Sequence, residues 1–198
     1  MNPAHPERTS LAVCLLAGGE ATRFPGKLES DAGGVPLLER VYENLRSIAP
    51  VTVSAKDGFS ADLKAALACP IVVDRWARRG PLAGLLSTLP MLDADRVFVA
   101  AGDLPFVDAQ VYARLNRAWT NDTQAAVPVH GSNDRIEPLC ALYDRAAFLE
   151  AAYPIFTNGS GSVREVVERL RVVRVRFEDG RVFANVNTAL DRRTLFHR

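Results

Sequence analysis

An arginine and a lysine follow two adjacent glycines near the start of the chain. The glycines are Gly18 and Gly19, the cations are Arg23 and Lys27, and the apolar run Leu11–Leu16 precedes them. Glycines let a backbone approach a ligand and expose its amides, and two fixed cations suit a polyphosphate. Taken singly, the glycines would form a tight turn and each cation would be a solvated surface group. Their combination in one loop predicts a site for a phosphate-bearing substrate.

Three known glycine motifs do not fit this loop. The Walker loop has four residues between its glycines and a Ser or Thr after its lysine. Here six residues separate Gly19 from Gly26, and Leu28 follows Lys27. The dinucleotide fingerprint and the kinase loop both need G-x-G, whereas Gly18 and Gly19 are adjacent and no H-R-D or D-F-G segment follows. The loop is therefore predicted to serve a phosphate chemistry other than that of these three motifs.

A carboxylate suited to hold a metal ion follows the apolar run 96–101. Asp103 comes directly after Gly102 and precedes Leu104-Pro105-Phe106. Mg²⁺ prefers carboxylate oxygens and takes its other ligands from water and substrate phosphates. Asp103 could also cap a turn, but the cationic loop favours the metal role. Fixed cations stabilise charge that grows on transferred and departing phosphates, so Lys27, Arg23 and Asp103 are the predicted catalytic residues.

Other polar groups lie at the ends of expected strands. The loop 78–84 leads into a helix, whose N-terminus can attract an anion, and we assign it to the nucleoside. Asp74 could accept a hydrogen bond from a base or a ribose, or it could cap a helix. Asn187 could complete the metal shell, orient an acceptor phosphate, or act as a cap.

Apolar runs alternate with amphipathic segments through the first two thirds of the chain. The predicted strands are 11–16, 51–54, 71–73 and 96–101, and the predicted helices are 36–48, 59–68, 81–89 and one capped by Asp108. This alternation predicts a Rossmann-like, three-layer α/β/α fold with a mostly parallel sheet. Ligands of such sheets bind at the carboxyl ends of the strands. We therefore expect the glycine loop, Asp74 and Asp103 to meet at one edge.

The last third of the chain has a different pattern. The predicted order is a strand over 125–129, a turn, a strand over 136–143, a helix over 144–152 that Pro154 stops, a capped helix over 162–170, a strand over 173–177, a hairpin turn at 179–180 with a returning strand over 181–186, and a helix from Thr188 to 195. These segments add an antiparallel strand or hairpin to the C-terminal third of the α/β fold.

Length and composition favour one domain over residues 1–198, with residues 1–10 as a flexible tail. The formal net charge is +1 without a block of like charge, so neither nucleic acid nor a membrane is expected as a partner. The tail lacks the apolar centre of a signal peptide. Cys14, Cys69 and Cys140 have no C-x-x-C spacing, which favours reduced thiols and a cytoplasmic location. The scattered histidines argue against a zinc site.

Five segments together resemble the molybdenum cofactor guanylyltransferases of the MobA type, within the nucleotidyltransferase superfamily. They are Leu16-Ala17-Gly18-Gly19 with Arg23 and Lys27, Asp74 with Gly80-Pro81-Leu82-Ala83-Gly84, Gly102-Asp103-Leu104-Pro105-Phe106, Arg135-Ile136-Glu137-Pro138-Leu139-Cys140-Ala141-Leu142, and Phe183-Ala184-Asn185-Val186-Asn187-Thr188. The resemblance covers nearly the whole chain.

The resemblance implies transfer of GMP from GTP to the terminal phosphate of molybdenum-loaded molybdopterin, with release of pyrophosphate and a requirement for Mg²⁺. Other enzymes of cofactor synthesis, or enzymes that accept the cofactor, would be its protein partners. The implied nucleotide-binding residues are Leu16, Ala17, Gly18, Gly19, Lys27, Ser54, Asp74, Gly80, Pro81, Gly84 and Asp103. The implied acceptor-binding residues are Arg135, Asn185 and Asn187, and the implied metal ligands are Asp103 and Asn187.

Two alternatives remain open at this stage. One keeps the fold but changes the substrates, as in a cytidylyltransferase or a sugar-phosphate nucleotidyltransferase. The other is a non-catalytic nucleotide-binding accessory protein. The second is motivated by departures from the family pattern at Gly26, which stands where an acidic residue is common, and at Ala189.

Overall fold

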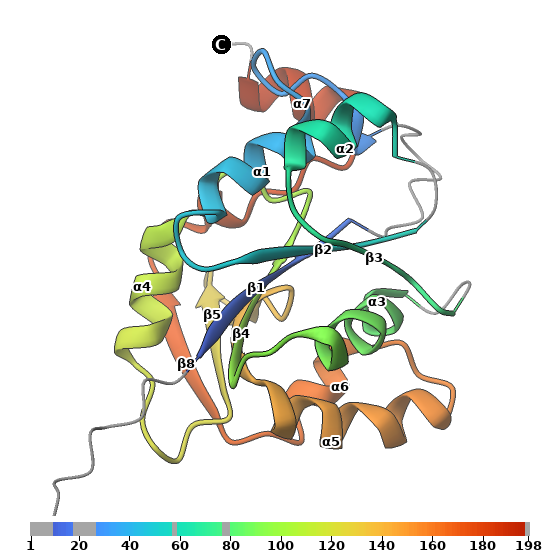
Figure 1. The fold of residues 1–198 in the computed structure, drawn as a ribbon. Coiled ribbons are helices and arrows are strands. Elements are labelled where there is room, and N and C mark those ends of the chain that lie inside the picture. The colour runs from blue at the N-terminus through green and yellow to red at the C-terminus, as the bar shows by residue number, and fades with distance from the viewer. Residues whose placement is uncertain (1–9, 18–26, 57–58, 77–79, 197–198) are drawn as a thin grey trace, which may run out of the picture.

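The computed structural model describes residues 10–17, 27–56, 59–76 and 80–196. Within these ranges helices cover both faces of an eight-stranded sheet (Figure 1). The strands are β1 (Leu11–Leu16), β2 (Val51–Ala55), β3 (Ile71–Val73), β4 (Arg96–Ala101), β5 (Ala125–His130), β6 (Arg135–Ile136), β7 (Cys140–Asp144) and β8 (Val172–Phe177). The α-helices are α1 (Leu37–Leu45), α2 (Ala61–Leu67), α3 (Gly80–Thr88), α4 (Ala109–Arg117), α5 (Arg145–Thr157), α6 (Val163–Val167) and α7 (Ala189–Phe196). The short 3-10 helices are η1 (Lys27–Glu29), η2 (Leu89–Met91) and η3 (Gly180–Phe183).

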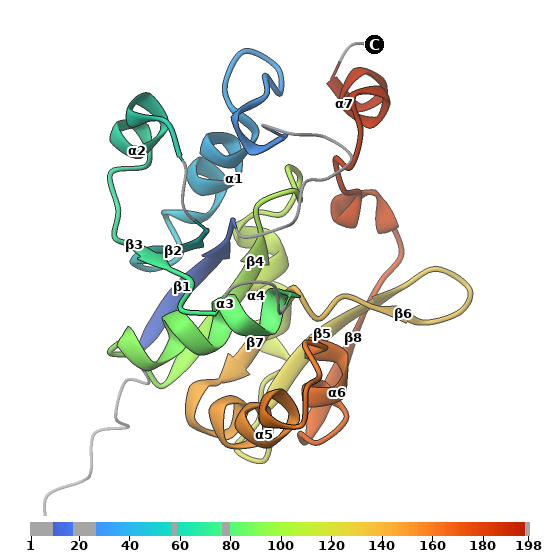
Figure 2. The ribbon, with the colours of Figure 1, turned by 90° about the vertical axis from the view of Figure 1, so that its right-hand side faces the viewer.

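The sheet order confirms the predicted α/β class with a mostly parallel sheet. The order is β3-β2-β1-β4-β7-β5-β6, and β8 pairs with β5. The strands β1 to β4 are mutually parallel, whereas β7 is antiparallel to both β4 and β5 (Figure 2). In the β1 register, Leu16 lies between Ser54 of β2 and Ala101 of β4. The chain therefore leaves these strands at the same edge of the sheet.

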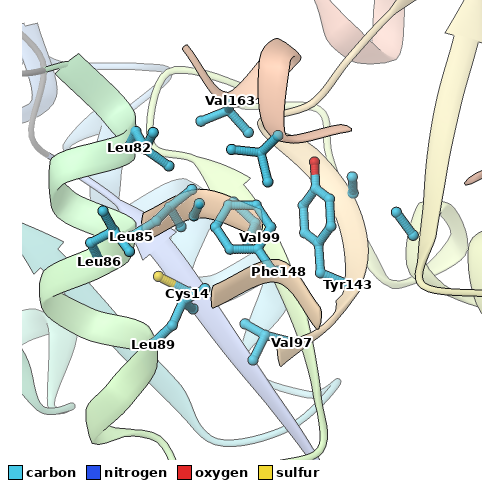
Figure 3. Close-up of a cluster of buried hydrophobic side chains, with 14 of the residues drawn as sticks. Cys14, Leu82, Leu85, Leu86, Leu89, Val97, Val99, Tyr143, Phe148 and Val163 are labelled. Atoms are coloured by element: carbon cyan, nitrogen blue, oxygen red, sulfur yellow. The ribbon is translucent and has the colours of Figure 1, made fainter. Parts of the chain in front are cut away.

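Two apolar cores, one on each face, hold the sheet in place. On one face α3, α5 and α6 pack on residues such as Val99 and Tyr143, with Leu85 and Phe148 between them (Figure 3). The rings of Tyr143 and Phe148 meet edge to face at 4.8 Å. On the other face α1, α2 and α4 cover a core that includes Phe98. Because β1 and β4 are buried on both faces, they read as nearly continuous apolar runs.

The strand predicted over 136–143 is broken into β6 and β7. Cys140 N–H donates to the Glu137 carbonyl at 3.1 Å, which closes a turn around Pro138. Proline has no N–H to give to a strand ladder, and this position allows the chain to change partners. Thus β6 pairs with β5, while β7 inserts between β5 and β4.

The prediction that Pro154 stops a helix was wrong. Helix α5 runs past this residue to Thr157. An interior proline removes one hydrogen bond of the helix. The turn that follows buries Ile155 and Phe156, and the Phe156 ring meets Trp76 edge to face at 5.1 Å. Burial of these side chains offsets the lost backbone bond.

The predicted hairpin at 179–180 is also absent, because residues 180–183 form the 3-10 helix η3. The Asp179 carboxylate accepts a hydrogen bond from Arg181 N–H at 2.8 Å and so caps this turn. Phe183 is buried edge to face against Phe177. The predicted helix over 162–170 ends early, at Val167.

The predicted C-terminal helix is confirmed as α7, and Asp191 N–H donates to Thr188 Oγ1 at 3.1 Å. Of the predicted flexible tail over residues 1–10, residues 1–9 lie outside the described residues, and Ser10 N–H donates to Asp95 Oδ2 at 3.0 Å. Of the helices in the described ranges, none combines the length and the apolar character needed to cross a membrane.

Candidate active site

The carboxyl edge of the parallel strands gathers segments that are distant in sequence. Gly102 N–H donates to the Leu16 carbonyl at 2.8 Å, and Ala17 N–H donates to the Ser54 carbonyl at 2.7 Å. Asp74 N–H donates to the Ala55 carbonyl at 2.8 Å. These backbone bonds extend the parallel ladder past the strand ends, so the loops after β1, β3 and β4 start from one rim, as the alternation of strands and helices predicts.

Lys27, Asp103 and Asn187 meet at this rim. The Lys27 ammonium lies 2.7 Å from Asp103 Oδ2 and 3.0 Å from Asn187 Oδ1. The Lys27 and Asp103 side chains are only 12% and 21% exposed, so water screens this pair incompletely. Lys27 opens η1, Asp103 follows β4, and Asn187 precedes α7. Three remote segments thus supply one cation and two oxygens that face it.

The segment that carries Asn187 is fixed from both sides. Val186 N–H donates to the Asp103 carbonyl at 3.0 Å, which ties this segment to the loop after β4. Asp191 Oδ2 accepts from Asn187 N–H at 2.9 Å and from Thr188 N–H at 2.8 Å. Asp191 satisfies backbone donors at the start of α7, where helices lack internal partners. Our sequence reasoning missed Asp191, although its spacing from Thr188 is that of a capping box.

The donor set at the rim suits a hard cation that keeps other ligands. A carboxylate oxygen of Asp103 and an amide oxygen of Asn187 converge on the Lys27 ammonium, and both oxygens are of the type that Mg²⁺ prefers. Among the described residues, no group of three or more His, Cys, Asp and Glu side chains could hold a metal ion by itself. This fits Mg²⁺ held by one or two protein oxygens together with phosphate oxygens and water.

A second polar group lies under the N-terminal half of α3. Ser54 Oγ donates to Asp74 Oδ1 at 3.1 Å, and Asp74 Oδ2 is buried without a hydrogen-bond partner in the described part of the chain. Burial raises the pKa of the Asp74 carboxyl above its ordinary 3.8, while the Ser54 hydrogen bond and the charge of Lys56 lower it in part. Asp74 therefore carries an acceptor that a ligand donor could satisfy.

Helix α3 approaches this pair closely because residue 84 is glycine. A Cβ at Gly84 would lie 2.6 Å from Ser54 Oγ and 3.1 Å from Asp74 Oδ1. At the start of the helix Gly80 has φ +63°, a conformation that suits glycine, and Pro81 occupies the first turn. Gly80 and Pro81 thus determine where α3 begins, and Gly84 determines how closely the helix packs on Ser54 and Asp74.

The buried thiol of Cys14 lies near Asp74 but is not suited to nucleophilic chemistry. Burial and then the charge of Asp74 raise its pKa to about 12. A thiol needs to ionise to react, and this environment opposes ionisation.

The predicted acceptor-side residues occupy two different environments. Arg135 lies on β6, is exposed, and places its Nε 3.0 Å from Glu137 Oε1. Asn185 has a buried Oδ1 with no hydrogen-bond partner in the described segments. Only Asn187 among these three contacts the Lys27 and Asp103 group within the described residues. No local pattern predicts the contact between His130 and Glu137, which lies beside Arg135.

Three predicted site residues, Gly18, Gly19 and Arg23, lie outside the described residues. Leu16 and Ala17, which precede them, are buried at the end of β1.

Comparisons with known proteins agree with this geometry. The family model for the MobA-like NTP transferase domain matches residues 13–175. A molybdenum cofactor guanylyltransferase from Burkholderia ambifaria is 34% identical over 193 residues, which cover 90% of this chain and 92% of that protein. A probable molybdenum cofactor guanylyltransferase from Methanocaldococcus jannaschii is 29% identical, over 91% of this chain and 95% of that protein. The crystal structure of molybdopterin-guanine dinucleotide biosynthesis protein A from Archaeoglobus fulgidus superposes with a TM-score of 0.77 at 25% identity, over 93% of this chain and 96% of that one.

Proposed function

This chain belongs to the MobA-like NTP transferase family, and we propose that it transfers GMP from GTP to the terminal phosphate of molybdenum-loaded molybdopterin. In this reaction an oxygen of the acceptor phosphate attacks the α-phosphorus of GTP. The bond from the α-phosphorus to the bridging oxygen breaks, and pyrophosphate leaves. The product is a guanine dinucleotide form of the molybdenum cofactor.

The observation that carries the proposal is the meeting of Lys27, Asp103 and Asn187. Attack at the α-phosphorus builds negative charge on that group and on the departing pyrophosphate. Two side-chain oxygens keep the Lys27 ammonium at this rim, so the cation already stands at the edge where the triphosphate would bind. We assign Lys27 to the triphosphate, with Arg23 as its partner.

Asp103 and Asn187 are the residues that would hold Mg²⁺. Bound there, the ion would supply positive charge to phosphate oxygens. Lys27 would then release its two oxygen partners and turn its ammonium toward the triphosphate. Asp191 keeps the Asn187 backbone in place while Lys27 moves, because its carboxylate accepts from Asn187 N–H just before α7.

The nucleoside is assigned to the other end of the rim. Asp74 Oδ2, which has no hydrogen-bond partner among the described residues, would accept from a donor of the base or the ribose, and Ser54 holds the other oxygen. Gly84 provides the space above them. The proposed nucleotide contacts are completed by Leu16, Ala17, Gly18, Gly19, Gly80 and Pro81.

The acceptor is assigned to Arg135, Asn185 and Asn187, within a single catalytic domain. Arg135 suits a terminal phosphate because its guanidinium can donate two parallel hydrogen bonds. Asn185 suits a neutral polar group, since its buried Oδ1 has no donor within the described ranges. Enzymes that make or receive the cofactor are the expected protein partners.

The direct test is to incubate the protein with Mg²⁺, molybdenum-loaded molybdopterin and each nucleoside triphosphate in turn, and to measure pyrophosphate. We expect release with GTP and none without the acceptor. Release with CTP alone would favour a cytidylyltransferase. Tight GTP binding without any release would favour a nucleotide-binding accessory protein.

A further inference from the structure

A buried carboxylate beside the β5–β6 hairpin binds two donors at once. Glu137 Oε1 lies 2.8 Å from His130 Nε2 and 3.0 Å from Arg135 Nε. Glu137 is only 9% exposed, and a buried carboxylate is costly unless it is paired. The strand register also places His130 opposite Arg135. The three side chains therefore form one cluster in which each donor compensates the charge of Glu137.

The His130 ring is held on its other sides by η3. It stacks on Phe183 with the ring centroids 5.1 Å apart and an angle of 28° between the planes. A Cβ at Gly180 would lie 2.6 Å from His130 Nδ1, so the glycine makes room for the ring. This network assigns the proton of the neutral imidazole to Nε2, from which it is donated to Glu137. His130 is thus fixed as a donor to the carboxylate.

The same carboxylate fixes one end of an exposed guanidinium. The Arg135 side chain is 58% exposed, although its Nε is bound to Glu137. More than half of the side chain therefore faces solvent, where a ligand could reach it. A guanidinium presents its donors in a rigid planar fork, so fixing Nε also fixes the direction of the other two nitrogens. Such a fork suits a phosphate, which can accept two parallel hydrogen bonds.

Two backbone connections link this cluster to the loop that carries Asp103. Ala101 N–H donates to the Leu139 carbonyl at 2.8 Å, and Leu139 follows the turn at Glu137. The segment after Phe183 reaches Val186, whose N–H donates to the Asp103 carbonyl at 3.0 Å. The cluster is therefore anchored to both segments that form the Asp103 side of the rim.

We propose that Glu137 and His130 are positioning residues, which hold Arg135 ready to bind the terminal phosphate of the acceptor. This inference rests on the proposed function and adds a specificity device to it. Glu137 orients the guanidinium through Nε, and His130 keeps Glu137 in its place. Of these three residues, only Arg135 touches the acceptor.

Steady-state kinetics of four variants test this assignment. Glu137→Gln keeps the size of the side chain but removes its charge, and His130→Gln keeps a donor near Glu137. Arg135→Ala removes the substrate contact, and the double variant with Glu137→Gln completes a double-mutant cycle. Asp134→Asn is the matched control, because Asp134 lies on the same hairpin and its change weakens an ion pair with Arg176 of β8 without touching Glu137.

We expect Glu137→Gln to raise the KM for the acceptor by roughly tenfold, since the ion pair that orients the Arg135 guanidinium is lost. The KM for GTP should stay within about twofold in Glu137→Gln, because this change does not touch the nucleotide side. In Asp134→Asn the KM for GTP and the KM for the acceptor should both stay within about twofold, because Glu137 is also untouched. His130→Gln should show a smaller change of the same kind. In the Arg135→Ala background, Glu137→Gln should add almost nothing.

Two results would overturn the positioning role while leaving the proposed function intact. One is a Glu137→Gln variant with an unchanged acceptor KM. The other is a Glu137→Gln change that raises the acceptor KM by the same factor in the Arg135→Ala background as in the wild type. That result would mean that Glu137 only stabilises the hairpin. Melting temperatures and circular dichroism of each variant separate loss of folding from loss of binding. A wild-type protein that releases no pyrophosphate with GTP and acceptor would overturn both proposals.

Discussion

The ammonium of Lys27 and the carboxylate of Asp103 are 2.7 Å apart, although 76 residues separate them in the sequence. The pair is nearly enclosed, because the two side chains are only 12% and 21% exposed. Asn187, which is 160 residues from Lys27, adds a second oxygen to the same ammonium. The contact exists because β1 and β4 are parallel neighbours whose following loops share a rim.

Replacing Asp103 with alanine should abolish most turnover without unfolding the protein. Pyrophosphate release should fall by about 100-fold or more, since the Mg²⁺ that Asp103 would hold at the reacting phosphates loses a ligand. Stability should change by about 1 kcal/mol, because Lys27 keeps its bond to Asn187. Glu43→Ala, which removes an exposed pair with Arg46, should keep full activity. Unchanged pyrophosphate release in Asp103→Ala would contradict the metal assignment.

Replacing Asp191 with alanine should impair catalysis through Asn187. The change leaves the N–H groups of Asn187 and Thr188 without their acceptor and should cost about 1 kcal/mol of stability. The kcat should fall by roughly tenfold as Asn187 loses its fixed position. Asp191→Asn keeps an acceptor oxygen and should restore much of the rate. Equal rates in the alanine variant and the wild type would show that the cap has no catalytic effect.

Replacing Gly84 with alanine should destabilise the protein despite the better helix propensity of alanine. The new methyl group would meet Ser54 Oγ at 2.6 Å, and such overpacking costs about 1–3 kcal/mol, against a propensity gain of about 1 kcal/mol. Adding Ser54→Ala removes the contact atom and should recover stability in urea titrations. A Gly84→Ala variant as stable as the wild type would show that α3 can move away from Ser54 at little cost in free energy.

Replacing Asp74 with asparagine should stabilise the protein at neutral pH and weaken GTP binding. Burial raises the pKa of the folded carboxyl above its ordinary 3.8, so the folded state holds its proton to higher pH than the unfolded state. Stability of the wild type therefore falls as the pH rises above the ordinary value, and the fall is complete above the raised value. Asparagine mimics the neutral carboxyl and avoids this loss.

Urea unfolding of Asp74→Asn and wild type at several pH values checks the sign of this effect. The difference in unfolding free energy should be largest at neutral pH and should vanish in acid, where the carboxyl is protonated in both states. Isothermal titration with GTP at neutral pH measures the loss of binding. A variant that is less stable than the wild type at neutral pH would contradict the pKa direction.

Much of the parallel half of the fold could be predicted from the sequence. The strands β1, β3 and β4 begin and end at the predicted residues, and Asp108 and Thr188 cap helices as expected. These elements depend on local signals, since a buried strand is a short apolar run and a cap is a side chain beside its own helix. Parallel topology then places the loops after β1, β3 and β4 at one edge.

In the first half α1 ends at Leu45, before the predicted residue 48, and α2 spans only Ala61–Leu67 of the predicted 59–68. The larger errors fall in the C-terminal third, where tertiary contacts override local signals. Pro154 does not stop α5, because the turn that follows buries Ile155 and Phe156. The signal for a hairpin at 179–180 gives way to η3, because Phe183 packs on Phe177. Predictions from local sequence include the hydrogen bond that a proline removes and the preference of residues for turns. They do not include the free energy gained when side chains are buried against a distant part of the chain.

The sequence by itself determined which residues could do chemistry and which strand ends carry them. Only the tertiary structure decided that Asn187 reaches Lys27, that Asp191 fixes Asn187, and that Glu137 binds both His130 and Arg135. Local patterns fix the backbone of one element at a time, whereas these contacts join segments whose distance depends on strand order and register. A side chain that follows a strand can be assigned to an edge from the sequence, but its partner across that edge is set by how the whole sheet packs.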